Sequence, residues 1–166
     1  QMLRRITAFS FVVFTIINNS CGDGDNPVND DHEGEHAEAA GLVLRNSGVE
    51  IVRYENGEVS GNIEVGFGRE TALLSVRFLA ENGDLFVPDT DDGFSMSVEI
   101  SDGAISEIER HEEDGAWNFH VIGLAAGRAE LTIKLNHDGH ADFVSKTIEV
   151  VVEEGGPGEI HEGEEG

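Results

Sequence analysis

Apolar and polar residues alternate along most of the chain between residues 41 and 152. Leu74, Val76 and Phe78, for example, fall on one face of an extended segment, with polar side chains between them. This period of two is typical of a half-buried β-strand, and no stretch keeps a helical period for more than two turns. The pattern therefore predicts an all-β chain. The expected strands are residues 42–44, 49–54, 58–65, 72–80, 85–87, 96–100, 104–110, 117–122, 129–135 and 143–152.

Short turn sequences separate these segments. Asn56-Gly57 and Asn82-Gly83 are Asn-Gly pairs, which favour two-residue hairpin turns because both residues accept a positive φ. Turn signals recur about every 8 to 15 residues, a spacing typical of two packed antiparallel sheets. Residues 41–152 also have the usual size of one domain. We therefore expect a single antiparallel β-sandwich between two tails.

The second half of this domain carries a family resemblance. The run FHVIGLAAGRAELTIKL, residues 119–135, followed by TIEVVV at residues 147–152, resembles bacterial immunoglobulin-like domains of group 2. Those domains end with a strand, a Gly-Leu-x-x-Gly turn, an alternating strand and a Val-rich strand, and Gly123, Leu124 and Gly127 match the turn. The resemblance implies an immunoglobulin-like sandwich outside the cytoplasm, used for adhesion, spacing or contact with carbohydrate and protein. It implies no catalytic residue.

The first 21 residues have the features of an export signal. Arg4 and Arg5 precede a mostly apolar stretch, Ile6–Ile17, which is too short to span a bilayer comfortably and suits a signal peptide. The segment ending at Cys21 resembles a bacterial lipoprotein signal, although Asn18 stands where leucine is usual. The resemblance implies a signal peptide over residues 1–20 and acylation of the Cys21 thiol. The protein would then be exported and tethered to the outer membrane or cell surface. The alternatives are an uncleaved anchor helix and a secretory peptide followed by a free thiol.

The chain is strongly acidic. It has 34 Asp and Glu residues against 10 Lys and Arg residues, a formal net charge of −24. Many of these acids lie in two glycine-containing segments with few large apolar residues, and we predict a disordered tether at 21–40 and a disordered tail at 153–166. Such a surface repels nucleic acid, which excludes it as a partner, and attracts cations. The single Cys21 excludes an internal disulfide and a cysteine-rich metal site.

Residues 136–142, Asn-His-Asp-Gly-His-Ala-Asp, form the sharpest local motif. If Asp138-Gly139 is a two-residue hairpin turn, His137 and His140 are directly opposed across the hairpin. Two imidazoles at that spacing can chelate one metal ion, with Asp142 as a third ligand on the strand face of His140. Zinc, copper and nickel accept this mixture of nitrogen and oxygen ligands. The fourth ligand would be His120 or a tether histidine such as His36.

The register of the two strands is not decided by the sequence, and the geometry of this site depends on it. A regular two-residue hairpin places Asp142 opposite Leu135 and Lys146 opposite Leu131, on the face that carries the apolar residues of the core. Two charged residues on that face are unfavourable unless they lie at its rim. A bulge near Ser145, or a loop of odd length, would change the pairing and loosen the contact between the two histidines.

Two other groups of residues are candidates for metal binding. His120 is expected to point outward, opposite Glu107, where it is either a ligand or an exposed histidine beside a carboxylate. Asp89, Asp91 and Asp92 precede a glycine and could bind calcium through oxygen, although the full EF-hand spacing is absent. An ordinary acidic turn is the alternative for that loop.

These observations lead to two predicted functions. The first is an exported, lipid-anchored metal-binding protein of the cell envelope, which could pass its ion to an envelope protein partner. The alternative is a structural or adhesive immunoglobulin-like module, a subunit of an extracellular fibre that self-associates by β-strand exchange, with residues 39–45 as a donor strand. We predict no enzymatic activity, because the chain has no Gly-x-Ser-x-Gly nucleophile motif and no phosphate-binding loop before a helix.

Overall fold

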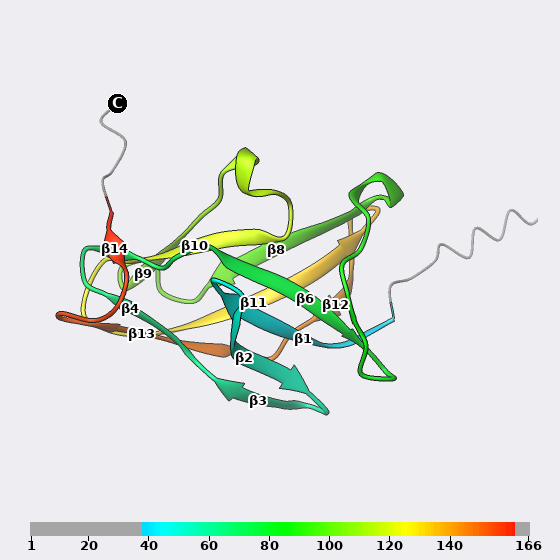
Figure 1. The fold of residues 1–166 in the computed structure, drawn as a ribbon, viewed down its shortest axis with the longest axis horizontal. Coiled ribbons are helices and arrows are strands. Elements are labelled where there is room, and N and C mark those ends of the chain that lie inside the picture. Colours follow the sequence, from blue (N-terminus) through cyan, green and yellow to red (C-terminus); the bar gives the residue numbers. More distant parts are fainter. Residues whose placement is uncertain (1–37, 162–166) are drawn as a thin grey trace, which may run out of the picture. The chain divides into compact units, whose positions relative to one another are not determined.

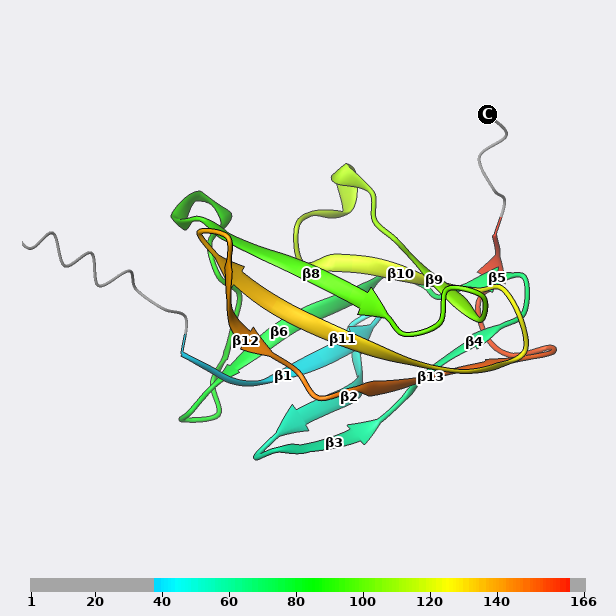
Figure 2. The same cartoon turned by 180° about the vertical axis from the view of Figure 1, so that it is seen from behind.

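The computed structural model describes residues 38–161 (Figures 1 and 2). The predicted signal peptide, Cys21, His36 and nearly all of the predicted tether lie outside the described residues. The described part is built almost entirely from strands, with two short 3-10 turns, η1 (Thr90–Asp92) and η2 (Glu112–Asp114). Within residues 38–161 no helix has the length and apolar character needed to cross a membrane.

The first sheet consists of nine strands joined by antiparallel pairings. Its main order is β14, β5, β10, β6, β1, β2 and β3, with β7 paired to β6 and β9 paired to β10. The strand bounds are β1 Ala39–Asn46, β2 Val49–Glu55, β3 Glu58–Gly61, β5 Arg69–Glu70, β6 Leu74–Ala80, β7 Leu85–Phe86, β9 Ser106–Glu109, β10 Asn118–Gly123 and β14 Glu159–Ile160.

The second sheet has five strands: β4 Ile63–Gly66, β8 Phe94–Ile100, β11 Gly127–His137, β12 His140–Val144 and β13 Ile148–Glu153. The long strand β11 organises it. Its first half pairs with β13 and its second half with β12, while β8 runs along the opposite edge from Leu131 to His137. All these pairings are antiparallel, whereas β4 pairs with β13 in parallel.

The core lies between the two sheets and draws apolar side chains from both. Leu44 and Phe119 of the first sheet and Ile133 and Val150 of the second are fully buried in one cluster. Phe78 of β6 lies among aromatic rings, with centroids 5.7 Å from Trp117, 6.0 Å from Phe86 and 5.9 Å from Phe143. The predicted all-β, immunoglobulin-like sandwich is therefore confirmed, with β4 and β13 as a parallel exception to the antiparallel pattern.

Two predicted strands are each broken into two, and one of them is divided between the sheets. The segment 58–65 separates at Gly61 into β3, in the first sheet, and β4, in the second. Gly61 has a φ of 83°, and a Cβ there would overlap the Ile51 carbonyl oxygen, so only glycine fits this crossing without strain. The segment 143–152 is also broken, into β12 and β13, but both strands stay in the second sheet, where they pair with different halves of β11. The alternation of apolar and polar residues does not reveal such a break, because the residues on both sides of it keep a period of two.

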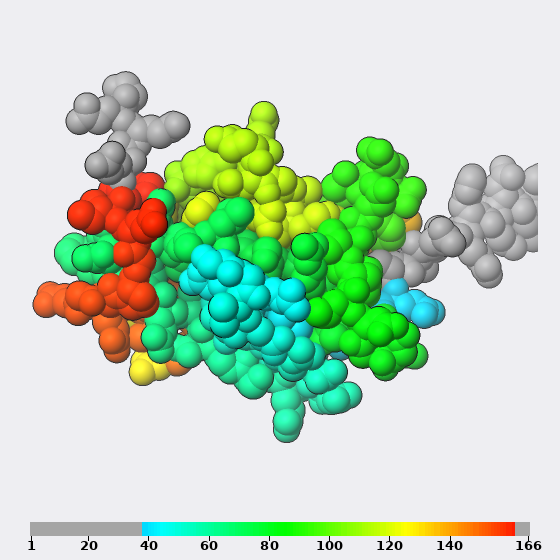
Figure 3. Space-filling model, in the orientation of Figure 1, coloured from blue at the N-terminus to red at the C-terminus, as the bar shows by residue number. Residues whose placement is uncertain are grey.

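The C-terminal segment differs from its prediction. Residues 153–161 fall in the predicted disordered tail, but β14 pairs with β5. In Figure 3 the red C-terminal segment packs against the rest of the domain. The Gly66 amide donates to the Pro157 carbonyl at 2.7 Å, and Ile160 stays 72% exposed. The segment is thus held by backbone hydrogen bonds rather than by apolar burial. Composition predicted disorder because it reports only the apolar surface that a segment can bury.

Strand β1 contains the segment proposed as a donor for strand exchange. It lies inside its own sheet, between β2 and β6, and Leu42, Val43 and Leu44 are fully buried there. Donating this strand to a neighbouring molecule would remove an interior strand from the donor's own core. The prediction assumed that residues 39–45 are free to pair with a neighbouring molecule. In the structure they form an interior strand of their own domain instead.

Candidate metal sites

The hairpin between β11 and β12 has the predicted turn. Asp138 and Gly139 have φ values of 47° and 87°, both positive, as a two-residue type I′ turn requires. His137 and His140 are directly opposed across the hairpin. This part of the prediction is confirmed, and it follows from the Asp-Gly pair between the two histidines.

A β-bulge next to this turn removes the difficulty of register. Ala141 lies opposite Asn136 and Phe143 opposite Leu135, so Asp142 is the extra residue of the bulge. Phe143 therefore takes the place in the core that a regular hairpin would give to Asp142. The predicted pairing of Asp142 with Leu135 is wrong, and the bulge falls at residue 142 rather than at Ser145.

The bulge brings the Asp142 carboxylate to both imidazoles. Its Oδ1 lies 3.2 Å from His140 Nε2 and its Oδ2 lies 3.7 Å from His137 Nδ1. Bonds of about 2.0–2.1 Å in a tetrahedral zinc site place neighbouring ligand atoms roughly 3.3 Å apart. One ligand atom from each of these residues, which we call the hairpin cluster, lies within 4.8 Å of the others. The three predicted ligands thus lie together, and the two contacts of Asp142 are close to the separation of neighbouring ligands around one ion.

The hairpin cluster lies at the rim of the core. The Asp142 side chain is only 3% exposed and that of His137 9%, whereas the His140 side chain is 57% exposed. The His137 ring stacks on Phe94, with centroids 4.3 Å apart and planes 19° apart. Burial of a carboxylate costs free energy unless hydrogen bonds or a positive charge offset that cost. Solvent reaches the group from the side of His140.

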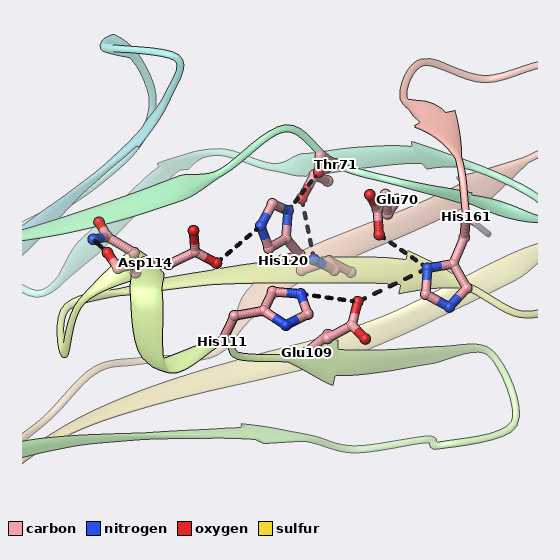
Figure 4. A network of polar contacts seen from close by, with 9 residues as sticks. Glu70, Thr71, Glu109, His111, Asp114, His120 and His161 are labelled. Atoms are coloured by element: carbon pink, nitrogen blue, oxygen red, sulfur yellow. Dashed lines mark hydrogen bonds and ion pairs between the residues drawn. The ribbon is translucent and has the colours of Figure 1, made fainter. Parts of the chain in front are cut away.

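A second histidine cluster lies on the first sheet and was not predicted as a unit. His111, at the start of η2, and Asp114, at its end, face His120 of β10, with one ligand atom of each within 4.8 Å of the others (Figure 4). We call these three residues the loop cluster. His120 lies opposite Glu109 rather than Glu107, so the predicted pairing was wrong by two residues. The predicted face of the strand for His120 was still correct, because a register shift of two residues keeps a side chain on the same face.

The position of His120 bears on the predicted fourth ligand. The structure places it in the loop cluster, with His111 and Asp114, and not among the ligand atoms of the hairpin cluster. The other predicted fourth ligand, His36, lies outside the described residues. Within residues 38–161 the hairpin cluster therefore offers three ligands, His137, His140 and Asp142.

A third group joins the C-terminal segment to the first sheet. His161 Nδ1 lies 2.9 Å from Glu70 Oε2 and 3.8 Å from Glu109 Oε2 (Figure 4). The hydrogen bond that His161 donates to the Glu70 carboxylate, with further attraction from Glu109 and Glu107, raises the pKa of His161 above its usual value despite a smaller opposing effect of burial. These residues come from β5, β9 and the tail, and no spacing in the sequence connects them.

The predicted calcium loop is an ordinary capped turn in the structure. Asp89 caps η1, and its Oδ1 accepts a hydrogen bond from the Asp91 amide at 3.0 Å. Gly93 closes the turn with a φ of 84°. The groups of His, Asp and Glu with converging ligand atoms in the described part of the chain do not include Asp89, Asp91 or Asp92. The arrangement therefore gives no support to calcium binding at this loop.

No protein-family model matches the chain, and no curated protein matches it. Among solved structures the chain is similar to domains 4 and 5 of the S-layer protein SbsC, with 18% identity and a TM-score of 0.40, covering 56% of this chain and 47% of that one. It is also similar to domains 5–6 of the same S-layer protein, with 19% identity and a TM-score of 0.39, covering 56% and 40%. This chain thus spans less than half the length of either structure. At this level of superposition we draw no functional conclusion from the matches.

Proposed function

We propose that this protein binds one divalent transition-metal ion, zinc, copper or nickel, at the hairpin cluster. The observation that carries the proposal is the nearly buried Asp142 carboxylate, whose two oxygens face two different imidazoles at 3.2 Å and 3.7 Å. A single cation between these groups neutralises the carboxylate and uses a lone pair from each ring.

The ligand types favour a transition metal over calcium. Two imidazole nitrogens and one carboxylate oxygen suit zinc, copper and nickel, whereas calcium takes six to eight oxygens. The exposed side of His140 leaves room for a water molecule or a further ligand to complete the coordination. We propose His36 of the tether as that further ligand, since an imidazole nitrogen suits the same metals.

We also propose that the protein is located in the cell envelope. Its support is the sequence of residues 1–40, in which a short apolar stretch leads to Cys21 and then to an acidic tether. A lipid on Cys21 would hold the domain at a membrane, and the net charge of −24 would raise the concentration of cations around it. An envelope partner that receives the ion is part of this proposal.

Isothermal titration of the purified protein with zinc, copper and nickel tests the metal site. We expect the His137→Ala/His140→Ala variant to bind one ion fewer than the unaltered protein. Asp84→Asn is the control, because it removes one carboxylate from an exposed turn outside the groups of converging ligands. Full stoichiometry and affinity in the double histidine variant would disprove the site.

The structural or adhesive module remains the second candidate, and a sheet edge favours it. Within the described residues β3 pairs with β2 alone, so its other edge is open to a strand from another molecule. Size-exclusion chromatography and electron microscopy of the native protein test this function. Fibres or defined oligomers would support it, and a strictly monomeric protein would remove it.

A further inference from the structure

We propose that the loop cluster, His111, Asp114 and His120, is a second and independent site for a divalent transition-metal ion. It lies on the first sheet and shares no residue with the hairpin cluster on the second. The proposal goes beyond the proposed function and does not depend on it, because its ligands, its supporting contacts and its test are separate.

The hydrogen bond of His120 determines which of its nitrogens can bind a cation. Its Nδ1 lies 2.9 Å from the backbone carbonyl oxygen of Thr71. A carbonyl can only accept, so Nδ1 carries the proton and donates it. In the neutral ring Nε2 then presents a lone pair. A backbone carbonyl that holds the distal nitrogen in this way is the usual outer partner of a metal-binding histidine.

The available nitrogen of His120 faces a carboxylate. Nε2 lies 3.5 Å from Asp114 Oδ2, and this oxygen is shielded from solvent and has no hydrogen-bond partner within the structure (Figure 4). A lone pair and an anionic oxygen repel each other at this distance unless a positive charge lies between them. A metal ion bound to both atoms supplies that charge, and a proton on Nε2 is the competing occupant.

His111 completes the group. Its ring centroid lies 5.8 Å from that of His120, and its Nε2 lies 3.7 Å from Glu109 Oε2. Glu109 thus faces one nitrogen of His111 as Thr71 faces one nitrogen of His120. Two imidazoles and one carboxylate are the same donor set as in the hairpin cluster, so the same metals, zinc, copper and nickel, suit the site.

The loop that carries Asp114 is held in place from two sides. The Arg110 guanidinium donates to the carbonyl of Met96 at 2.9 Å and also to the carbonyl of Ala116. The side-chain amide of Asn118 donates a hydrogen bond to the backbone carbonyl of Asp114. These contacts join η2 to strands of both sheets before any ion binds, so little ordering is needed on binding. His111 is the most exposed of the three ligands and leaves one side of the site open to solvent.

Zinc titration of four proteins tests this site: the unaltered protein, His111→Ala/His120→Ala, His137→Ala/His140→Ala, and the variant with all four substitutions. We expect each double variant to lose one equivalent of zinc and the quadruple variant to lose two. Asp84→Asn is the control, since it removes an exposed carboxylate outside every group of converging ligands in the described residues and should keep the full stoichiometry. Full stoichiometry in His111→Ala/His120→Ala overturns the inference, and full stoichiometry in His137→Ala/His140→Ala overturns only the proposed function.

A measurement on the unaltered protein guards against variants that fail to fold. In a sample with ¹⁵N-labelled histidine at pH 7.5, we expect zinc to shift the Nε2 resonance of His120 while its Nδ1 stays protonated. Asp114→Asn keeps the size of the side chain and should weaken zinc binding at this site at least tenfold. An Nε2 resonance that zinc leaves unchanged, or one that is already protonated and stays so, overturns the inference in favour of a simple ion pair with Asp114.

Discussion

Replacing Asp142 with asparagine gives the sharpest test of the hairpin cluster. The side chain is 3% exposed and lies between two imidazoles, so Asp142→Asn removes the charge and one metal ligand with almost no change of volume. The experiment is made in a His111→Ala/His120→Ala background, so that the loop cluster does not contribute. In that background we expect zinc to stabilise the parent protein much more than the Asp142→Asn protein.

The size of the effect follows from linkage and from the size of the domain. Zinc at 100 times its dissociation constant stabilises a one-site protein by about 2.7 kcal/mol. A folded unit of about 120 residues unfolds with an entropy of roughly 0.25 kcal/mol/K, from about 2.1 cal/mol/K per residue. The parent Tm should therefore rise by about 10 °C. A tenfold loss of affinity leaves roughly 1.4 kcal/mol, or about 5–6 °C, at the same zinc concentration.

The fluorescence of Trp117 is a direct readout of unfolding. It is the single tryptophan of the chain, it is buried, and its ring packs edge-on against Phe78 in the core. Melting curves with zinc and with a chelator then give the zinc-dependent rise in Tm for each protein. An equal rise in Tm for Asp142→Asn and its parent would contradict the assignment of Asp142 as a ligand, as would an equal loss of the zinc effect in an Asp84→Asn control.

Three further predictions concern the fold and the C-terminal segment. Phe78→Ala should reduce the free energy of unfolding by about 3–5 kcal/mol, measured by urea denaturation, because the ring is fully buried among other aromatic rings. Gly123→Ala should destabilise the protein by about 1–3 kcal/mol because its Cβ would overlap the backbone of β4. Gly103→Ala has open space at its Cβ and should have little effect. Equal stabilities of the two variants would contradict the close approach of β4 to Gly123. The Glu70 carboxylate raises the pKa of His161, so docking of β14 should be strongest below about pH 6.5 and weaken as the pH rises through the folded-state pKa. Amide hydrogen exchange in β14 with a chelator present measures this, and a pH dependence that persists in His161→Gln would contradict it.

The class of the fold and the hairpin of the proposed metal site could be predicted from the sequence alone. Period-two alternation and Asn-Gly turns predict strands and their connections, since both depend on neighbours in the chain. The Asp138-Gly139 turn likewise brings His137 and His140 together through local backbone geometry alone. These features follow from short-range sterics, which a sequence records directly.

Only the tertiary structure decided where Asp142 points. The bulge exists because Phe143, one residue later, packs against Phe78 and Tyr54, with ring centroids 5.9 Å and 5.8 Å away. The register of β12 is thus determined by the core, through residues that lie far away in the sequence. A local pattern could only show that a regular hairpin would bury a carboxylate.

The loop cluster and the docked C-terminal segment depend on tertiary structure in the same way. His120 owes its tautomer to the Thr71 carbonyl, 49 residues away, and His161 owes its partner Glu70 to a strand 91 residues away. Contacts at such separations arise from the pairing of β5, β9, β10 and β14, which no spacing in the sequence encodes. The sequence therefore contains the residues of both proposed metal sites, and the packing of the two sheets determines which of them lie together.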